Sequence, residues 1–179
     1  MKRSICILVT LAGLASAQDK PPVLSPNPLS SSPVNLELTV YLVSGFGQPQ
    51  AASKDEVPQD LAATLQQLRS VFAYKSYKLL EAITLRGRNF SGSEVAGELP
   101  DGKYYDFRYV RARISAETPH MVHLDSLRLE ISWSRARKDQ MALVSTDLDV
   151  REGQKTVVGK SAVAGTDALF LVIVPKVIE

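Results

Sequence analysis

The chain has almost no cysteine. Its one cysteine, Cys6, lies in the N-terminal stretch MKRSICILVTLAGLASA, residues 1–17. A basic pair, an uncharged apolar core and the small residues Ala15-Ser16-Ala17 are the three parts of a secretory signal peptide. The pattern predicts cleavage after Ala17, which would leave a mature chain without cysteine or disulfide. The apolar core is also shorter than the roughly 20 residues that a membrane-spanning helix needs.

The predicted mature protein also lacks net charge. The chain has 21 basic and 19 acidic side chains, and Lys2 and Arg3 would leave with the signal peptide, which holds no acidic residue. Bulk charge therefore gives no reason to expect a nucleic-acid partner. An exported chain without disulfides favours a bacterial envelope, in a periplasmic or extracellular location. We expect membrane contact only through the signal peptide before cleavage.

A proline-rich segment follows the predicted cleavage point. Residues 20–33 read KPPVLSPNPLSSSP and hold five of the ten prolines. Because proline blocks both helix and ladder hydrogen bonds, residues 18–33 are predicted to form an extended, flexible leader. A proline-rich peptide that docks onto another protein is the alternative. The remainder, residues 34–179, is long enough for one domain with a packed core.

Alternation of apolar and polar residues predicts strands over much of this domain. NLELTVYLV, from Asn35, places leucine and valine on one side. HLDSLRLEISW predicts an inward row that is formed by Leu127, Leu129, Ile131 and Trp133. The run from Ala168 to Val174 is apolar on both faces, which predicts a central strand that is covered on each side.

One segment has the period of a helix. In VPQDLAATLQQLRSVF, Leu61, Leu65, Leu68 and Phe72 recur every three or four residues and form one apolar stripe. Such a helix packs on a sheet. The order of strand, helix and then a long β region predicts an α+β fold, with a mainly antiparallel sheet or meander and one amphipathic helix packed on it.

The segment GQKTVVGKS, residues 153–161, is close to a phosphate-binding loop. That loop needs four residues between its first glycine and the Gly-Lys pair, but here five intervene, Gln154 to Val158. A polar turn precedes the segment and no helix pattern follows it, so we expect no nucleotide ligand. Turns at Glu152-Gly153 and around Gly165 instead predict two hairpins, and Gly159 inside a strand pattern predicts a bulge.

The C-terminal strands resemble the end of the secretin domain of bacterial outer-membrane secretion pores. Val150 to Gly159 gives a polar strand, a Glu-Gly-Gln turn and a valine-rich strand ending in glycine, and Leu169 to Val177 gives an apolar strand closing near proline and lysine. Only Lys160 to Ala168 intervenes, so the membrane-inserting and gate segments of secretins are absent. The preceding strand, helix and strand look similar to the ring-forming periplasmic modules of that family. The resemblance implies a periplasmic interaction module rather than a pore.

Residues that could perform chemistry are few. His120 and His123 are the two histidines, and their spacing places them on opposite faces of a strand, with Asp125 on the face of His123. Asp147 and Asp149 share a strand face and could form an acid–base pair. Two histidines without cysteine are too few to predict a metal site. We predict no catalytic residue, no metal site and no cofactor.

Basic residues gather between residues 103 and 138, which hold eight basic and four acidic side chains. Arg111 and Arg113 share a strand face, and Arg108 and Tyr109 precede them. This group of four is the predicted partner-binding site, suited to an anionic envelope polymer or to the acidic edge of a protein. A solvated face that is balanced by acids elsewhere is the alternative.

These observations predict an exported, non-enzymatic envelope protein that acts as a protein-interaction or assembly module, and the resemblance implies a relation to a secretion system. Its partner would be an envelope protein or another copy of the chain. The alternative is a small exported hydrolase or carbohydrate-acting enzyme with a site near His123 and Asp125. A pocket that converges on these two residues would separate the two hypotheses.

Overall fold

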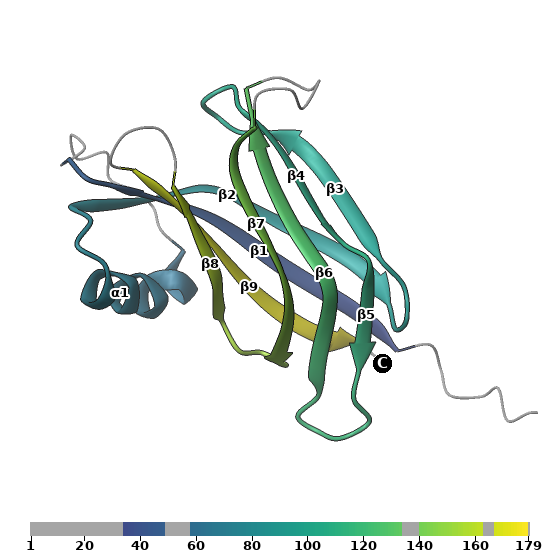
Figure 1. Ribbon diagram of the computed structural model, residues 1–179. Helices are drawn as coiled ribbons and strands as arrows, with labels where there is room; N and C mark the ends of the chain where they lie inside the picture. The colour runs from purple at the N-terminus through teal and green to yellow at the C-terminus, as the bar shows by residue number, and fades with distance from the viewer. Residues whose placement is uncertain (1–33, 49–57, 134–139, 163–166, 179) are drawn as a thin grey trace, which may run out of the picture. The chain divides into compact units, whose positions relative to one another are not determined.

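The computed structural model describes residues 34–48, 58–133, 140–162 and 167–178. The signal peptide and leader predicted for residues 1–33 lie outside these ranges and stay predictions. Within the described ranges the structure is mainly β, all strand pairs are antiparallel, and one short α-helix is present (Figure 1). The predicted class, antiparallel sheet with one helix, is confirmed at this level.

The first sheet has four strands in the order β2-β1-β9-β8. Their bounds are Asn35–Phe46 for β1, Ser76–Arg88 for β2, Thr156–Ala162 for β8 and Ala168–Ile178 for β9. β9 pairs with β1 along one edge and with β8 along the other. The central position that was predicted for this doubly apolar strand is therefore confirmed.

The second sheet has five strands, β3 to β7. Their bounds are Ser93–Glu98, Tyr104–Tyr109, Arg111–Ile114, Met121–Ser132 and Gln140–Arg151. β4 pairs with the end of β6 and β5 with its beginning, while β7 pairs along the whole of β6. β4 and β5 thus follow one another along one edge of β6, β7 occupies the other edge, and β3 pairs with β4.

The main core lies between the two sheets. Leucines and valines at alternate positions of β1 meet apolar side chains of β4, β6, β7 and β9, and most of these are completely buried. The members that are less than 2% exposed include Leu36, Leu38, Val40, Leu42, Phe107, Leu124, Leu127, Leu129, Leu171 and Ile173. Burying a leucine or isoleucine side chain contributes about 1.5–3 kcal/mol relative to leaving it exposed, so this layer holds the sheets together.

The helix covers the other face of the first sheet. A 3₁₀ turn, Gln59–Leu61, leads into α1, Ala62–Val71. Leu61, Leu65 and Leu68 are buried against Phe170 and Val172 of β9 in a second apolar cluster. The leucine stripe and its packing on the sheet are therefore confirmed. No helix in the described part of the chain is long and apolar enough to span a membrane.

Two expectations about connectivity are wrong. The strands divide into two sheets instead of one meander, because β9 inserts between β1 and β8. The turn at Glu152-Gly153 joins β7 of the second sheet to β8 of the first, so these neighbours in sequence do not form a hairpin. The turn itself has the backbone that was expected, with Gly153 at φ +73°. Gly165 lies outside the described residues, but β8 and β9 do pair as predicted.

A glycine bulge confirms one prediction, and the end of β6 corrects another. The register of β8 against β9 shifts between Val157 and Gly159, as the glycine predicted. A second shift lies between β6 and β7, where Ile131 pairs with Ala142 but Ser132 pairs with Gln140, so the extra residue belongs to β7. β6 ends at Ser132, and Trp133, which was expected to face inward, is 57% exposed.

Candidate functional site

The outer face of the second sheet, which points away from the core, carries most of the polar residues considered above. Alternation along β4 and β6 sends Phe107, Tyr109 and Leu129 inward and leaves Arg108 and Arg128 on the outer face. The prediction that Tyr109 belongs to the partner-binding surface is therefore wrong, since its side chain is 2% exposed and belongs to the core. Burial also raises the pKa of the Tyr109 phenol.

Two arginines stand opposite each other at the centre of this face. Arg108 on β4 and Arg128 on β6 are direct cross-strand partners. Like charges in this position repel. Arg128 is compensated, because its Nε donates to Oε1 of Glu130 at 2.7 Å. Arg108 forms no such ion pair among the described residues, although Glu94 on β3 is its other register partner. A shallow hollow of about 690 Å³ lies here and is lined by Arg108, Arg128, Glu94, Val110, Gly92 and three serines, among others.

Arg111 and Arg113 lie on β5 and both point outward, as predicted. Their environments differ. A terminal nitrogen of Arg113 donates to Oδ1 of Asp125 at 3.0 Å. Arg111 forms no ion pair within the described part of the chain, although Asp125 is its partner in the strand register. The structure thus separates the predicted binding residues into a paired Arg113, a buried Tyr109, and Arg108 and Arg111, which form no ion pair among the described residues.

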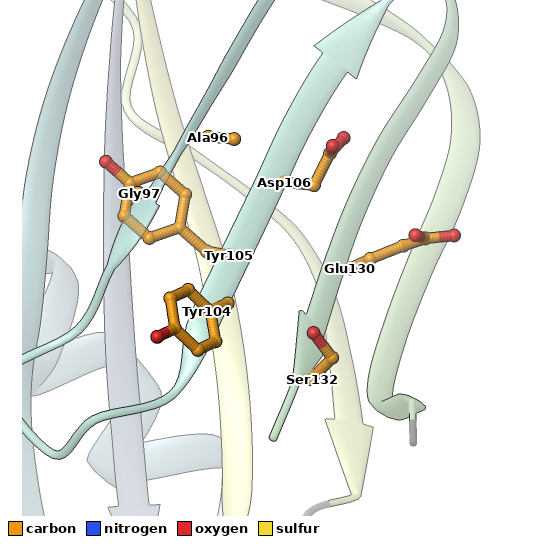
Figure 2. A pocket seen from close by; sticks show the side chains of 7 residues that line it. All are labelled: Ala96, Gly97, Tyr104, Tyr105, Asp106, Glu130 and Ser132. Atoms are coloured by element: carbon orange, nitrogen blue, oxygen red, sulfur yellow. The ribbon is translucent and has the colours of Figure 1, made fainter. Parts of the chain in front are cut away.

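A second hollow, of about 360 Å³, lies on the outer side of β3, β4 and β6 (Figure 2). Its lining residues are Ala96, Gly97, Tyr104, Tyr105, Asp106, Glu130 and Ser132. Asp106 and Glu130 come from neighbouring strands and are direct register partners. The hydrogen bonds between Arg128 and Glu130 offset part of the repulsion between these two carboxylates.

His123 is the centre of a polar cluster near the other end of this face. Its Nε2 lies 2.8 Å from Oδ1 of Asp125, which confirms that the two residues share a face, and its Nδ1 lies 2.6 Å from Oδ1 of Asp149 on β7. The hydrogen bond with Asp149 raises the pKa of His123; partial desolvation opposes the shift and the bond with Asp125 adds to it. Desolvation acts to raise the pKa of Asp125, but His123 and Arg113 outweigh it and lower that pKa.

This arrangement is poorly suited to general base catalysis. Carboxylate oxygens only accept hydrogen bonds. An imidazole with a carboxylate at each of its two nitrogens is therefore favoured in its doubly protonated form. Asp147 and Asp149 contact different groups: Asp147 accepts a hydrogen bond from the backbone nitrogen of Ser126 at 2.6 Å, whereas Asp149 contacts His123. His120 contacts the carbonyl oxygen of Ser115. Among the described residues, no group of three or more potential ligands has a geometry that could hold a metal ion.

The GKS segment lies in β8, as its sequence context predicted. Lys160 places its Nζ 5.6 Å from the ring centre of Phe72 and 5.3 Å from that of Tyr74, both at cation–π distance. The Ser161 hydroxyl accepts a hydrogen bond from the backbone nitrogen of Leu143 at 3.1 Å. Lys160 and Ser161 therefore connect β8 to two aromatic residues of the second apolar cluster, Phe72 and Tyr74, and to β7.

Two residues near the arginines were not identified from the sequence. Phe90, in the turn between β2 and β3, is 70% exposed, and Val110, between β4 and β5, is 64% exposed. The segment NFSGS offers one signal, since a large aromatic residue stands among small polar turn residues. Val110 has no comparable signal, because it continues an alternating pattern that reads as strand.

Comparisons with known proteins give one informative result. No protein-family model matches the chain, and no curated protein sequence matches it. Among solved structures, the chain is similar to the secretin InvG of the Salmonella SPI-1 type III secretion injectisome, residues 176 to the end, in the open gate state. The match has 11% sequence identity and a TM-score of 0.46, and covers 84% of this chain but only 62% of that chain. A weak secretin-like resemblance, first noted in the C-terminal strands, is thus also found by comparison of structures.

Proposed function

We propose that this chain is an exported, non-enzymatic protein of a bacterial envelope that binds a protein partner or assembles with copies of itself. The signal pattern of residues 1–17 supports export from the cytoplasm, and the proline-rich leader would precede the domain as a flexible segment. The secretin-like order of the C-terminal strands is the reason to include a role connected with a secretion system. The partner is an envelope protein or a second copy.

The observation that carries the proposal is the pair of arginines without ion pairs, Arg108 and Arg111. Both lie on the outer face of the second sheet, and neither forms an ion pair among the described residues, although Glu94 and Asp125 are their register partners. On its other side Arg108 faces Arg128, and this pairing of like charges costs stability. Arginine is enriched in protein interfaces because its planar guanidinium binds carboxylates in two-point contacts. A surface that gathers such groups at a cost to the fold is well suited to binding an acidic partner.

The alternative, hydrolysis or carbohydrate chemistry near His123 and Asp125, has less support. A catalytic histidine needs one nitrogen available to the substrate, whereas both nitrogens of His123 already contact carboxylates. Arg113 engages the same Asp125 oxygen that His123 contacts. The hollow beside His123 is also open and shallow, with only Arg113, Ile114, Ser115 and Met121 added to the cluster.

Photo-crosslinking in the envelope tests the proposal. The full chain, expressed in a bacterium, would carry a photoreactive phenylalanine analogue at position 108 or 111, and at the exposed position 78 of β2 as control. We expect ultraviolet-dependent adducts with a protein or a second copy from positions 108 and 111, and none from 78. Arg108→Glu with Arg111→Glu should remove the partner while thermal unfolding stays unchanged. Adducts equally frequent from position 78, or a partner retained by the double variant, would overturn the proposal.

A further inference from the structure

Phe90 and Val110 belong to two chain segments that lie side by side. The backbone nitrogen of Phe90 donates to the carbonyl of Ala112 at 2.7 Å, and the nitrogen of Ala112 donates to the carbonyl of Ser91 at 2.9 Å. A Cβ at Gly92 would lie 2.5 Å from the carbonyl oxygen of Val110, so the approach is close. Two residues with large apolar side chains thus lie in adjacent segments beside the junction of β4 and β5, and both are mostly exposed.

Phe90 has an unfavourable backbone conformation as well as an exposed ring. Its φ is +64°, in the left-handed region that glycine and asparagine adopt readily and aromatic residues rarely adopt. The neighbouring Asn89 has a structural role, because its side-chain oxygen accepts a hydrogen bond from the nitrogen of Ile114 at 3.0 Å. The Phe90 side chain gains little from the core at 70% exposure. A residue that strains the backbone and contributes little to the core is a candidate for a role in binding.

The charges around this apolar pair are mainly basic, with Glu94 as an acidic neighbour in the hollow. Arg88 lies two residues before Phe90, Arg111 follows Val110, and Arg108 lines the hollow that Val110 also lines. In the part of the chain that the structure describes, none of these three arginines has an ion-pair partner. Two acids lie in the strand register: Asp125, opposite Arg111, already contacts Arg113 and His123, and Glu94 lies opposite Arg108.

We propose that Phe90 and Val110 are the anchor of a docking surface, with Arg88, Arg108 and Arg111 as its rim. The occupant is an acidic segment of a protein partner, whose apolar side chain covers the Phe90–Val110 pair while its carboxylates bind the arginines. An anionic polysaccharide would pair with the arginines but would leave the apolar pair exposed to water. This inference rests on the proposed interaction function and adds the chemistry of the partner.

A display library of short random peptides, selected on the immobilised full chain, tests the inference. Enriched peptides should combine aspartate or glutamate with a large apolar residue. Phe90→Gly is the decisive variant, because it removes the ring and relieves the left-handed backbone, so its melting temperature should not fall. Phe90→Gly and Arg111→Glu should each weaken peptide binding by about tenfold or more, as loss of an interface anchor does. Val71→Ser and Lys78→Glu are matched controls at exposed positions elsewhere and should leave affinity unchanged.

Several outcomes would overturn the inference. These are enrichment of basic or neutral peptides, no enrichment, undiminished binding by Phe90→Gly, or binding only of an anionic polysaccharide such as alginate. The crosslinking experiment separates this failure from that of the proposed function. If Phe90→Gly leaves the adducts from position 111 intact, the apolar anchor is wrong while the interaction function stands. If positions 108 and 111 yield no adducts, both fail.

Discussion

Nδ1 of His123 lies 2.6 Å from Oδ1 of Asp149, which links β6 to the neighbouring strand β7 through a side chain. The other ring nitrogen lies 2.8 Å from Asp125 on β6 itself, and Asp125 also accepts from Arg113 on β5. One histidine thus takes part in a polar connection across three adjacent strands. Because its strength depends on the charge of the imidazole, the connection should vary with pH.

His123→Asn should destabilise the chain more at about pH 5 than at about pH 9. The pKa of His123 is raised above 6.5 in the folded chain, so its stabilisation is fully present below pH 6.5 and is lost as the pH rises through the folded pKa. The pKa of Asp125 is lowered from 3.8, so its contribution is present above that pH and is lost as the pH falls through the lowered value. Urea unfolding of parent and variant across this range measures the difference.

The control for this prediction is His120→Asn. Nδ1 of His120 contacts the backbone carbonyl of Ser115. Both ring nitrogens of His123 contact carboxylates. A difference for His123→Asn that is constant with pH, or larger at pH 9, would contradict the electrostatic explanation. In the parent, nuclear magnetic resonance titration should also give His123 a pKa above 6.5, and Asp149→Asn should lower it.

Lys160→Met should lower the free energy of unfolding by about 0.5–1 kcal/mol, while Lys160→Arg should preserve it. The reason is the contact of its ammonium group with the rings of Phe72 and Tyr74. Methionine retains most of the apolar stem but removes the charge. Chemical denaturation of the two variants measures the effect. Equal stability of the methionine variant and the parent would mean that the cation–π contacts contribute nothing in solution.

Local pattern was sufficient to predict the elements that have one buried stripe or two buried faces. The leucines of β1, the stripe from Leu61 to Phe72 and the doubly apolar β9 all pack as their periods indicate. The bulge at Gly159 was also predictable, because an isolated glycine in a strand has few other uses. Each of these features depends on a few consecutive residues.

Features that depend on distant residues were not predictable. The pairing of β9 with β1 rather than only with β8 depends on contacts more than a hundred residues apart, which no local pattern encodes. It splits the expected meander into two sheets. Likewise β6 ends at Ser132, and Trp133 just beyond it is exposed, although the alternating pattern continues through it. The exposed, left-handed Phe90 contradicts local preference altogether, as functional positions often do.

Phe170→Ala should destabilise the chain by about 3–5 kcal/mol, and Phe170→Leu by clearly less. Phe170 is completely buried, and its ring centre lies 5.0 Å from that of Phe72, 5.7 Å from Tyr74 and 5.8 Å from Tyr77. Alanine would leave a cavity at the centre of this aromatic cluster, between β9 and α1. Urea denaturation followed by circular dichroism measures the loss. A loss below about 1 kcal/mol for the alanine variant would show that the cluster is not packed as described.

Gly92→Ala should be more destabilising than the same substitution at Gly159. A Cβ at Gly92 would lie 2.5 Å from the carbonyl oxygen of Val110 and 2.7 Å from that of Tyr109, and backbone atoms can yield only if the two segments separate. At Gly159 the nearest atom, at 3.0 Å, is a methyl group of Val144, which can adjust by side-chain rotation. Overpacking of this kind costs typically about 1–3 kcal/mol, and we expect the Gly92 variant near the upper end.

Thermal unfolding and peptide binding together test this last prediction, because Gly92 holds the segment of Phe90 against that of Val110. Separating the two segments should weaken binding of the acidic peptides that the docking surface selects. Gly159→Ala should leave the affinity for these peptides unchanged. A Gly92→Ala variant as stable as the parent would show that the two segments do not approach as closely as described. A destabilised variant that still binds the peptides fully would show that docking does not depend on how the two segments are held together.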